Sequence, residues 1–406
     1  MEPLVFLTNL TVLLLIGLIC GVVSRKLKIP NMLLLILSGI FLSNMTINSQ
    51  PIVQLSQGFL LSTSILTLVM LVFDGSSRFK LKELDTYSEL AVKTVVVFLV
   101  LNLLILSTAV YFLFNLQNPL IALLFAAVMS GTDPGSVLTL FKTKSNRIVE
   151  ILKFESVINT PIIVLIPFLI LDLIKLEVNI VSEFLDRIVP FLQQIITGVG
   201  TGIVVGIVVF KFMKKVYSKQ LSPLTMITAA LLTYILAEQL GGNGVLAVTV
   251  LGVFFGNIYV KEKESLQEFS SMLSNSLEIL VFILVGFILS ISVEPMFILK
   301  SILLFVIMIA IRFIAMQIVY LEDHMNFKER LFMAVNCTKG IAVAVVAFML
   351  SKSVIKYRGE MTDLILISGM SEVISLMVLF IIYSIILSSI FVRFSKKFIR
   401  IKVEEE

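Results

Sequence analysis

Two acidic residues, Asp133 and Glu155, stand in segments that are otherwise apolar enough to be buried in a membrane. A carboxylate in hydrocarbon costs several kcal/mol, so an ionisable residue at such a place indicates a functional site. A buried carboxylate can hold either a proton or a cation. The chemistry to expect from residues 129–161 is therefore the binding of a small positive ion.

The segment that carries Asp133 is predicted to be broken, because it contains the sequence GTDPG at residues 131–135. Pro134 lacks an N–H and clashes with the carbonyl of Ser130, while the glycines tolerate unwinding. Irregular backbone at membrane depth is allowed only where it lines a cavity or is buried in protein. A helix broken beside an acid builds ion sites in transporters, which makes Thr132 and Asp133 candidate ligands. A proline kink with an incidental acid is the alternative.

The next segment carries a polar face. At 100° per residue, four polar side chains lie within an arc of about 140°: Glu155, Ser156, Asn159 and Thr160. Pro161 releases the carbonyl of Val157 on the same helix, which offers a further oxygen to a cation. A capping cluster at the helix start is the rival interpretation, but it explains Glu155 and Ser156 only.

Three further charged residues stand in or beside apolar segments. An unpaired Arg312 inside the membrane would cost too much free energy, so it needs an acidic partner. Glu155 is the first candidate. Lys339 and Gly340 interrupt a second apolar segment. Asp74 closes an apolar run before a basic loop, where it acts either as an ion ligand or as an interfacial acid.

Two other acids, Glu238 and Glu278, stand near predicted segment ends, and we expect both at the membrane interface.

The composition indicates that these residues belong to a multi-pass membrane protein. Of the 406 residues, 58% are hydrophobic and 15% are charged, and the mean hydropathy is +1.06. A spanning helix needs about 20 apolar residues. Thirteen spans are predicted, at residues 4–23, 30–47, 59–74, 90–114, 119–141, 154–174, 188–213, 222–240, 243–260, 275–292, 297–320, 331–351 and 365–392. They leave no room for a soluble catalytic domain, so an enzyme is not expected.

The loops indicate the topology. One alternating set of loops, with the C-terminal tail, carries 23 Lys and Arg, and the other set carries 6. The positive-inside rule then places the N-terminus outside and the C-terminus in the cytoplasm. The net charge of +5 therefore reflects the membrane topology and does not indicate nucleic-acid binding.

The two interrupted segments lie seven spans apart, as an inverted repeat would place them. We expect a first repeat at 1–187, a linking helix at 188–221, a second repeat at 222–392 and a short tail at 393–406.

With these residues in this order, the chain resembles the sodium/proton antiporters of the cation:proton antiporter superfamily, in the group of prokaryotic NhaP-type antiporters and animal sodium/proton exchangers. The matching motifs are Phe73-Asp74-Gly75, Thr132-Asp133-Pro134, Glu155 to Asn159, Arg312 and Lys339-Gly340. The resemblance implies a homodimer in the lipid bilayer, two crossed broken helices, elevator-type alternating access and a role in pH homeostasis. It implies no cofactor, and a prokaryotic plasma membrane as the location.

The resemblance also implies roles for the charged residues. Glu155 with Arg312 would be a structural ion pair, and Asp133 and Lys339 would balance the charge at the crossed helices. Two positions depart from the family pattern: Thr160 stands where the family has its ion-carrying Asp, and Lys339 replaces the usual Arg. A lysine can lose its proton when buried, whereas an arginine effectively cannot.

An exchanger needs one site that binds either a proton or a cation. Without an acid at 160, we expect Asp74 to carry the ion, with Asp133 as the other candidate. Oxygen ligands for Na⁺, K⁺ or Li⁺ would come from Asp74, Thr132, Asp133, Ser156, Asn159, Thr160 and the carbonyl of Val157. Na⁺ is the first candidate.

Two other classes remain open. The first is an altered family member without standard exchange, which would act as a sensor, a channel or a carrier of another substrate; the missing acid motivates it. The second is an intramembrane aspartyl protease that uses Asp74 and Asp133. That class requires a G-x-G-D motif, and this chain has Ser130-Gly131-Thr132-Asp133 instead.

Overall fold

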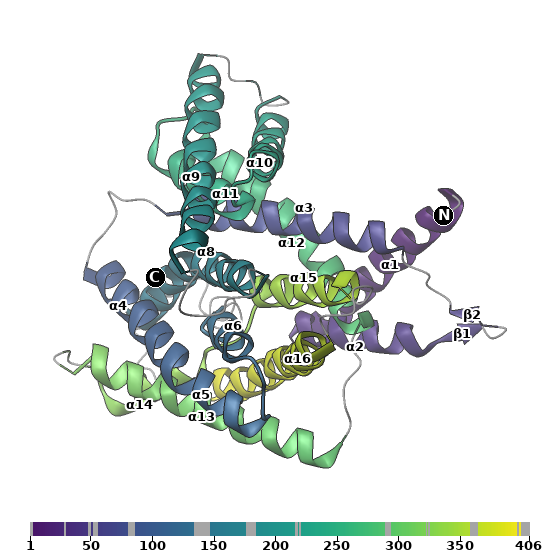
Figure 1. Ribbon diagram of the computed structural model, residues 1–406, viewed down its shortest axis with the longest axis vertical. Coiled ribbons are helices and arrows are strands. Elements are labelled where there is room, and N and C mark those ends of the chain that lie inside the picture. Colours follow the sequence, from purple (N-terminus) through teal and green to yellow (C-terminus); the bar gives the residue numbers. More distant parts are fainter. Residues whose placement is uncertain are drawn as a thin grey trace.

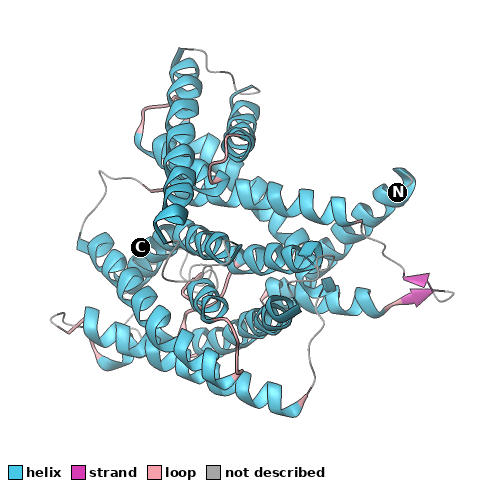
Figure 2. Cartoon of the chain, in the orientation of Figure 1, coloured by secondary structure: helices cyan, strands magenta, loops and turns pink. Residues whose placement is uncertain are grey.

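The structure is a computed structural model in which almost every described residue is helical (Figures 1 and 2). It describes residues 3–27, 30–47, 50–51, 56–79, 86–133, 147–175, 184–215, 218, 221–288, 294–321, 323, 325–357, 364–395 and 398. The helices are α1 (Pro3–Leu27), α2 (Asn31–Asn44), α3 (Gln57–Ser77), α4 (Thr86–Leu101), η2 (Asn102–Leu106), α5 (Ser107–Leu113), α6 (Pro119–Met129), α8 (Arg147–Lys175), α9 (Phe184–Lys215), α10 (Leu221–Gln239), α11 (Gly244–Asn257), α12 (Lys263–Ile288), α13 (Pro295–Val319), α14 (Phe327–Val335), α15 (Ile341–Tyr357) and α16 (Leu364–Arg393). The two short strands β1 (Thr46–Ile47) and β2 (Gln50–Pro51) pair between α2 and α3.

The predicted spans fall on these helices. In the described part of the chain, eight helices are long and apolar enough to cross a membrane. Shorter apolar helical stretches lie at Asn31–Asn44, Pro119–Met129, Ile162–Leu171, Gly244–Asn257 and Ile341–Ser351. The span predicted at 90–114 is α4 continued through the π-helical turn η2 into α5. The span predicted at 331–351 is interrupted, because α14 and α15 are separate helices. Of the span predicted at 119–141, the structure describes α6, which ends at Met129, and residues 130–133, which are not helical.

The boundary that differs most from the prediction is the start of α12. The span expected at 275–292 is α12, which begins at Lys263. Its first half is polar, so hydropathy alone missed it. Glu278, expected at the membrane interface, therefore lies in the middle of a helix. Glu238 lies in the last turn of α10, where its Oε1 accepts a hydrogen bond from the Gly244 N–H at the start of α11.

The outer surface of the bundle is apolar. Large aliphatic side chains are exposed on several helices, among them Leu18 on α1 at 68%, Val208 on α9 at 64% and Leu303 on α13 at 50%. Such exposure would favour aggregation in water, but it is the normal surface of helices that face lipid.

Small residues set the helix packing around the interior. Gly39 on α2 and Gly286 on α12 face each other, and a Cβ on either would collide with the backbone of the other helix. Gly252 and Gly256 on α11 likewise meet the backbone of α3 near Ser77. Close approach of backbones through small residues is the usual way in which membrane helices pack. It holds α3 and α12 against their neighbours.

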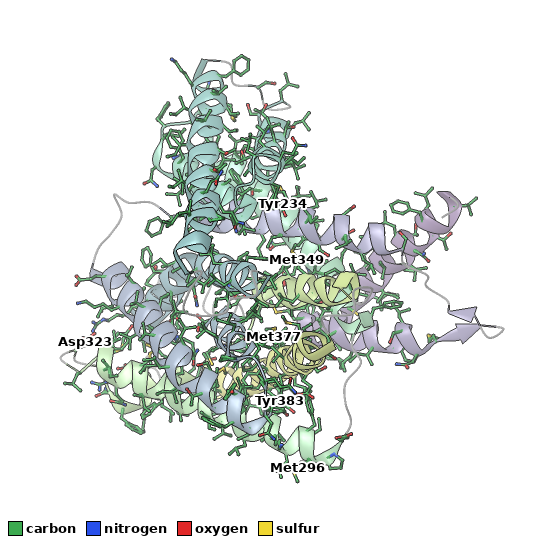
Figure 3. The ribbon with its side chains drawn as sticks, viewed as in Figure 1. Tyr234, Met296, Asp323, Met349, Met377 and Tyr383 are labelled. Carbon is green, nitrogen blue, oxygen red and sulfur yellow. The ribbon has the colours of Figure 1, made fainter. Side chains whose placement is uncertain are left out.

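In Figure 1, α6, α8, α15 and α16 occupy the middle of the molecule, while α9 and α10 extend to one side of it. Figure 3 agrees: Met349 on α15 and Met377 on α16 lie centrally, and Asp323 lies near the edge. The centre of the molecule is where the two interrupted helices meet.

Candidate functional site: the crossing of two broken helices

The two interruptions are hydrogen-bonded to each other. The N–H of Asp133, after the end of α6, donates to the carbonyl of Thr338 over 2.7 Å. The hydroxyl of Thr338, between α14 and α15, donates in turn to the carbonyl of Asp133. Backbone groups that the breaks leave outside a helix are thus satisfied across the crossing, as burial requires.

A carboxylate lies at the start of α15. Gly340 precedes that helix, and a Cβ at this position would collide with the side chain of Asp133. The N-terminal end of a helix carries a partial positive charge, which stabilises an anion placed there. Asp133, which is partly buried, therefore neutralises one end of a broken helix, and position 340 must be glycine to allow it.

A lysine lies at the end of α6. Lys339 is fully buried, and its Nζ donates to the carbonyls of Met129 over 2.6 Å and Gly131 over 2.7 Å. These carbonyls belong to the last residue of α6 and to the break, and they carry the negative end of the helix dipole. The ring of Phe98 lies 5.5 Å from the Nζ.

A buried ion pair lies beside the crossing. Arg312 on α13 is 0% exposed and Glu155 on α8 is 1% exposed, and the Nη2–Oε1 distance is 2.5 Å. Arg312 also stacks over Phe98, with 4.6 Å between its Cζ and the ring centroid. Glu155 is thus the partner that the sequence analysis assigned to Arg312. A buried pair that lost one member would leave a costly charge.

The ion pair is joined to the break by Thr132. Its hydroxyl donates to Glu155 Oε1 over 2.7 Å and accepts from Asn159 Nδ2 over 2.9 Å. Asn159 also donates to the carbonyl of Ser130 over 3.2 Å. The second oxygen of Glu155, Oε2, is buried without a hydrogen-bond partner among the described residues. Since buried polar atoms are normally paired, this network has an oxygen available for a ligand.

Besides Asn159, three of the predicted ligands lie on the same helix, α8, as Glu155. Ser156 is partly buried and has a partner. The side chains of Val157 and Thr160 lie outside the described residues.

Asp74 lies in another place. Near the end of α3, its Oδ1 accepts from Ser271 on α12 over 2.9 Å, and its Oδ2 lies 3.3 Å from Arg78 Nε. Arg78 also donates to the Ser271 hydroxyl. The described hydrogen bonds of Asp74 therefore go to α12 and to its own helix, and not to Thr132 or Asn159.

A cavity of about 680 Å³ lies beside this second group. It is lined by Arg78 and by residues of α12, including Gln267, Ser271 and Asn275. The basic loops that follow α3 and precede α12 are both on the side that the positive-inside rule assigns to the cytoplasm.

Sequence reasoning missed Glu278. It lies on α12, one turn beyond Ser274, whose hydroxyl donates to the carbonyl of Met70 on α3. A signal was available in the spacing: Gln267, Ser271, Ser274 and Glu278 follow one another at intervals of four, three and four residues. This is the period of one face of a helix.

Comparison with known proteins gives a consistent match. A family model described as sodium/hydrogen exchanger, transmembrane, matches residues 11–395. The chain is 26% identical over 382 residues to the protein named Probable Na(+)/H(+) antiporter 2 of Methanocaldococcus jannaschii, covering 88% of this chain and 87% of that relative. It is 26% identical over 260 residues to the K(+)/H(+) antiporter NhaP of Alkalimonas amylolytica, covering 61% of this chain and 43% of the relative.

Among solved structures, that of the sodium proton antiporter MjNhaP1 from M. jannaschii at pH 8 superposes with a TM-score of 0.81. It covers 98% of this chain and 99% of the other chain at 19% sequence identity. At this identity the similarity concerns the fold. The predicted fold class, an all-helical multi-pass membrane protein, is confirmed.

Proposed function

Because the chain belongs to the sodium/hydrogen exchanger family, we propose that it exchanges a monovalent cation, with Na⁺ as the first candidate, for protons across a prokaryotic plasma membrane. The observation that carries the proposal is the crossing itself. Asp133, Thr132 and Asn159 meet there beside a buried carboxylate, and each supplies oxygen atoms of the kind that alkali cations bind.

Exchange follows from competition for this site. A cation and a proton cannot both occupy one carboxylate, so binding of one releases the other. Glu155 and Lys339 are engaged by fixed partners, Arg312 and the α6 carbonyls. We assign them the role of a frame that keeps Thr132 and Asp133 in position.

Asp74 belongs to the cytoplasmic approach in this proposal. Its side chain is 15% exposed, that of Arg78 is 44% exposed, and both lie beside the cavity of the α3–α12 region. A cation that reaches Asp74 competes with Arg78 for its carboxylate. An exposed ion pair contributes little stability, so this competition is energetically easy.

The site would alternate between the two sides by an elevator-type movement of a homodimer. The inverted repeats proposed at 1–187 and 222–392 would supply one interrupted helix each, and residues 188–221 would link them. The length of α9, Phe184–Lys215, and its packing against α10 and α11 support a linking element of this kind. The N-terminus would face outside and the tail at 393–406, of which the structure describes 393–395 and 398, would face the cytoplasm.

Proton flux in proteoliposomes tests the exchange. The purified chain is reconstituted with a pH-sensitive dye inside, and gradients of Na⁺, K⁺ or Li⁺ are imposed with and without an ionophore that clamps the voltage. We expect cation-driven proton flux that saturates with Na⁺. Relatives are named for both Na⁺ and K⁺, so the same experiment ranks the two ions.

Protein-free liposomes and the Arg312→Met variant are the controls. Absence of flux with all three cations would reject the proposal and would favour the altered family member, whose motive is Thr160 at the position of the usual acid.

A further inference from the structure

A π-helical turn interrupts the membrane span that begins with α4. The turn η2 lies between α4 and α5 and packs against α6 and α13. A π turn joins residues five apart instead of four; it is rare, and single π turns inside helices occur frequently at functional sites. The sequence of η2 is NLLIL, which contains neither proline nor glycine. The turn must therefore be held by contacts with other helices, and not by a helix-breaking residue.

The π turn keeps one face of the span directed to the interior. In an uninterrupted α-helix, residues at successive intervals of four drift by about 40° each time. Because a π turn holds more residues per turn, it offsets part of this drift. The face that Phe98 presents to Arg312 and Lys339 thus continues beyond the turn. Its members follow one another at intervals of four and are each at most 1% exposed: Phe98, Asn102, Leu106 and Val110.

The first residue of the turn, Asn102, reaches the end of α6. Its side chain is 0% exposed, and its Nδ2 donates to the hydroxyl of Ser130 over 3.2 Å. That hydroxyl donates in turn to the carbonyl of Ala126 over 2.8 Å. Since this bond uses the single hydrogen of the hydroxyl, Ser130 can only accept from Asn102. The orientation of the amide is thereby fixed, with its nitrogen toward Ser130.

The amide oxygen of Asn102 carries a cost. Oδ1 is buried and has no hydrogen-bond partner in the part of the chain that the structure describes. A buried polar atom without a partner is destabilising, and an apolar side chain of the same shape would avoid the penalty. An amide that stability does not require, at the start of a π turn, indicates a role in function.

The end of α6 is held from two sides. Ser130 is the C-cap residue of this helix. Asn159 on α8 donates to the carbonyl of Ser130 over 3.2 Å and to the hydroxyl of Thr132 over 2.9 Å. Asn102 holds the hydroxyl of the same serine from the opposite element of sequence, η2. The position of Ser130 in turn fixes where the segment with Thr132 and Asp133 leaves the helix.

We propose that Asn102 is a positioning residue of the ion site: held by the π turn, it orients Ser130 and thereby the oxygen atoms of Thr132 and Asp133 for an alkali cation. The inference rests on the proposed exchange function and adds to it a residue outside both broken helices and outside α8. The preference among cations depends on where the oxygen atoms lie. Loss of this support should therefore change the affinity and the preference for cations.

Cation-driven proton flux in proteoliposomes tests the proposal, with Na⁺ and K⁺ compared in one preparation. Asn102→Leu keeps a side chain of similar size and removes the amide. We expect the KM for Na⁺ to rise by about threefold or more, and the ratio of kcat/KM for Na⁺ to that for K⁺ to shift by about threefold or more. A merely structural role would reduce the amount of active protein and leave both quantities unchanged, and that result would overturn the proposal.

The matched control is Asn31→Leu at the start of α2. The Oδ1 of Asn31 is likewise buried without a hydrogen-bond partner within the described ranges, but α2 packs against α1 and α12. We expect the wild-type KM and the wild-type ratio for this variant. An equal shift in Asn31→Leu and Asn102→Leu would overturn the assignment, because the effect would not be specific to the crossing.

A second variant keeps the test decisive if Asn102→Leu does not fold. Ser130→Ala removes the acceptor and leaves Asn102 in place, and we expect it to raise the KM for Na⁺ in the same way. In the double variant, Asn102→Leu should add less than about twofold to the effect of Ser130→Ala, since residues that act through one contact are not additive. A wild-type KM in Ser130→Ala, or full additivity in the double variant, would overturn the proposal.

The two proposals fail in different ways. If the wild type drives cation-dependent proton flux and Asn102→Leu has the wild-type KM and ratio, only the assignment of Asn102 is wrong. If the wild type drives no flux with Na⁺, K⁺ or Li⁺, the exchange function and the assignment both fall.

Discussion

Two regions of this protein use acidic and basic side chains in opposite ways. At the crossing, Arg312 and Lys339 are 0% exposed and make short contacts with fixed partners. In the α3–α12 region, Asp74 and Arg78 form a longer contact at 3.3 Å, beside a cavity. The first arrangement is permanent, whereas the second can open for an incoming ion.

The difference shows why buried charge alone does not identify an ion carrier. A buried pair is held because separating it leaves an uncompensated charge, and such a pair cannot exchange ions at each transport cycle. An ion-binding acid must instead not be held by a fully buried protein cation. By this criterion Glu155 and Lys339 are frame residues, and the exchangeable acids are those near the cavity and Asp133.

Breaking the buried pair should have the largest effect. Arg312→Met leaves Glu155 charged and unpaired, and we expect the free energy of unfolding to fall by about 3–5 kcal/mol. SDS titration in mixed micelles measures it. The double variant Arg312→Met/Glu155→Leu should recover much of the loss, and Arg78→Met should cost less than about 1 kcal/mol. Equal losses in Arg312→Met and Arg78→Met would contradict the contrast between the regions.

Replacing the lysine at the end of α6 should have the second-largest effect on stability. Lys339→Met leaves the carbonyls of Met129 and Gly131 without their donor, and we expect a loss of about 1–3 kcal/mol in the same titration. Lys93→Met is the control, because Lys93 is exposed and pairs with Glu89 on its own helix. A Lys339→Met protein as stable as the control variant would remove Lys339 from the frame.

The close approach at the start of α15 gives a third test. Gly340→Ala should push the Asp133 side chain away and cost about 1–3 kcal/mol, as overpacking does, with slower transport. Gly200→Ala, on α9, meets no atom within 4 Å and should be neutral or slightly stabilising. If both substitutions behaved alike, the placement of Asp133 against Gly340 would be wrong.

The smallest effect on stability should come from the pair formed by Asp74 and Arg78. Arg78→Gln removes a competitor for Asp74, so we expect a lower KM for Na⁺ by about two- to fivefold with a stability change below about 1 kcal/mol. Rates of proton flux against Na⁺ concentration measure it. A raised KM would show that Arg78 assists binding and does not compete for Asp74.

The sequence predicted the features that follow from the cost of burial. Arg312 in an apolar helix required an acid, and Pro134 with its glycines required a break; the paired Glu155 and the end of α6 at Met129 meet both requirements. That Asp133 and Lys339 meet at the crossing could only be inferred from the family, because spacing along the chain does not say which broken ends meet.

The prediction from the sequence was wrong where a segment is helical but not hydrophobic. The start of α12 is polar yet helical, so the predicted span began too late and placed Glu278 at the interface. The π-helical turn η2 was also missed. In it Asn102 donates to the Ser130 hydroxyl over 3.2 Å, a tertiary contact with no local signal.

The proposed function places ion binding where the two broken helices cross. Thr132→Val tests it most directly, because it keeps the side-chain shape and removes the hydroxyl that joins Glu155 and Asn159. The matched control is Thr233→Val on α10, a buried threonine whose hydroxyl bonds its own helix. In proteoliposomes we predict that kcat/KM for Na⁺-driven proton flux falls by about tenfold or more in Thr132→Val and stays unchanged in Thr233→Val. A Thr132→Val protein that exchanges at the wild-type rate would contradict the account.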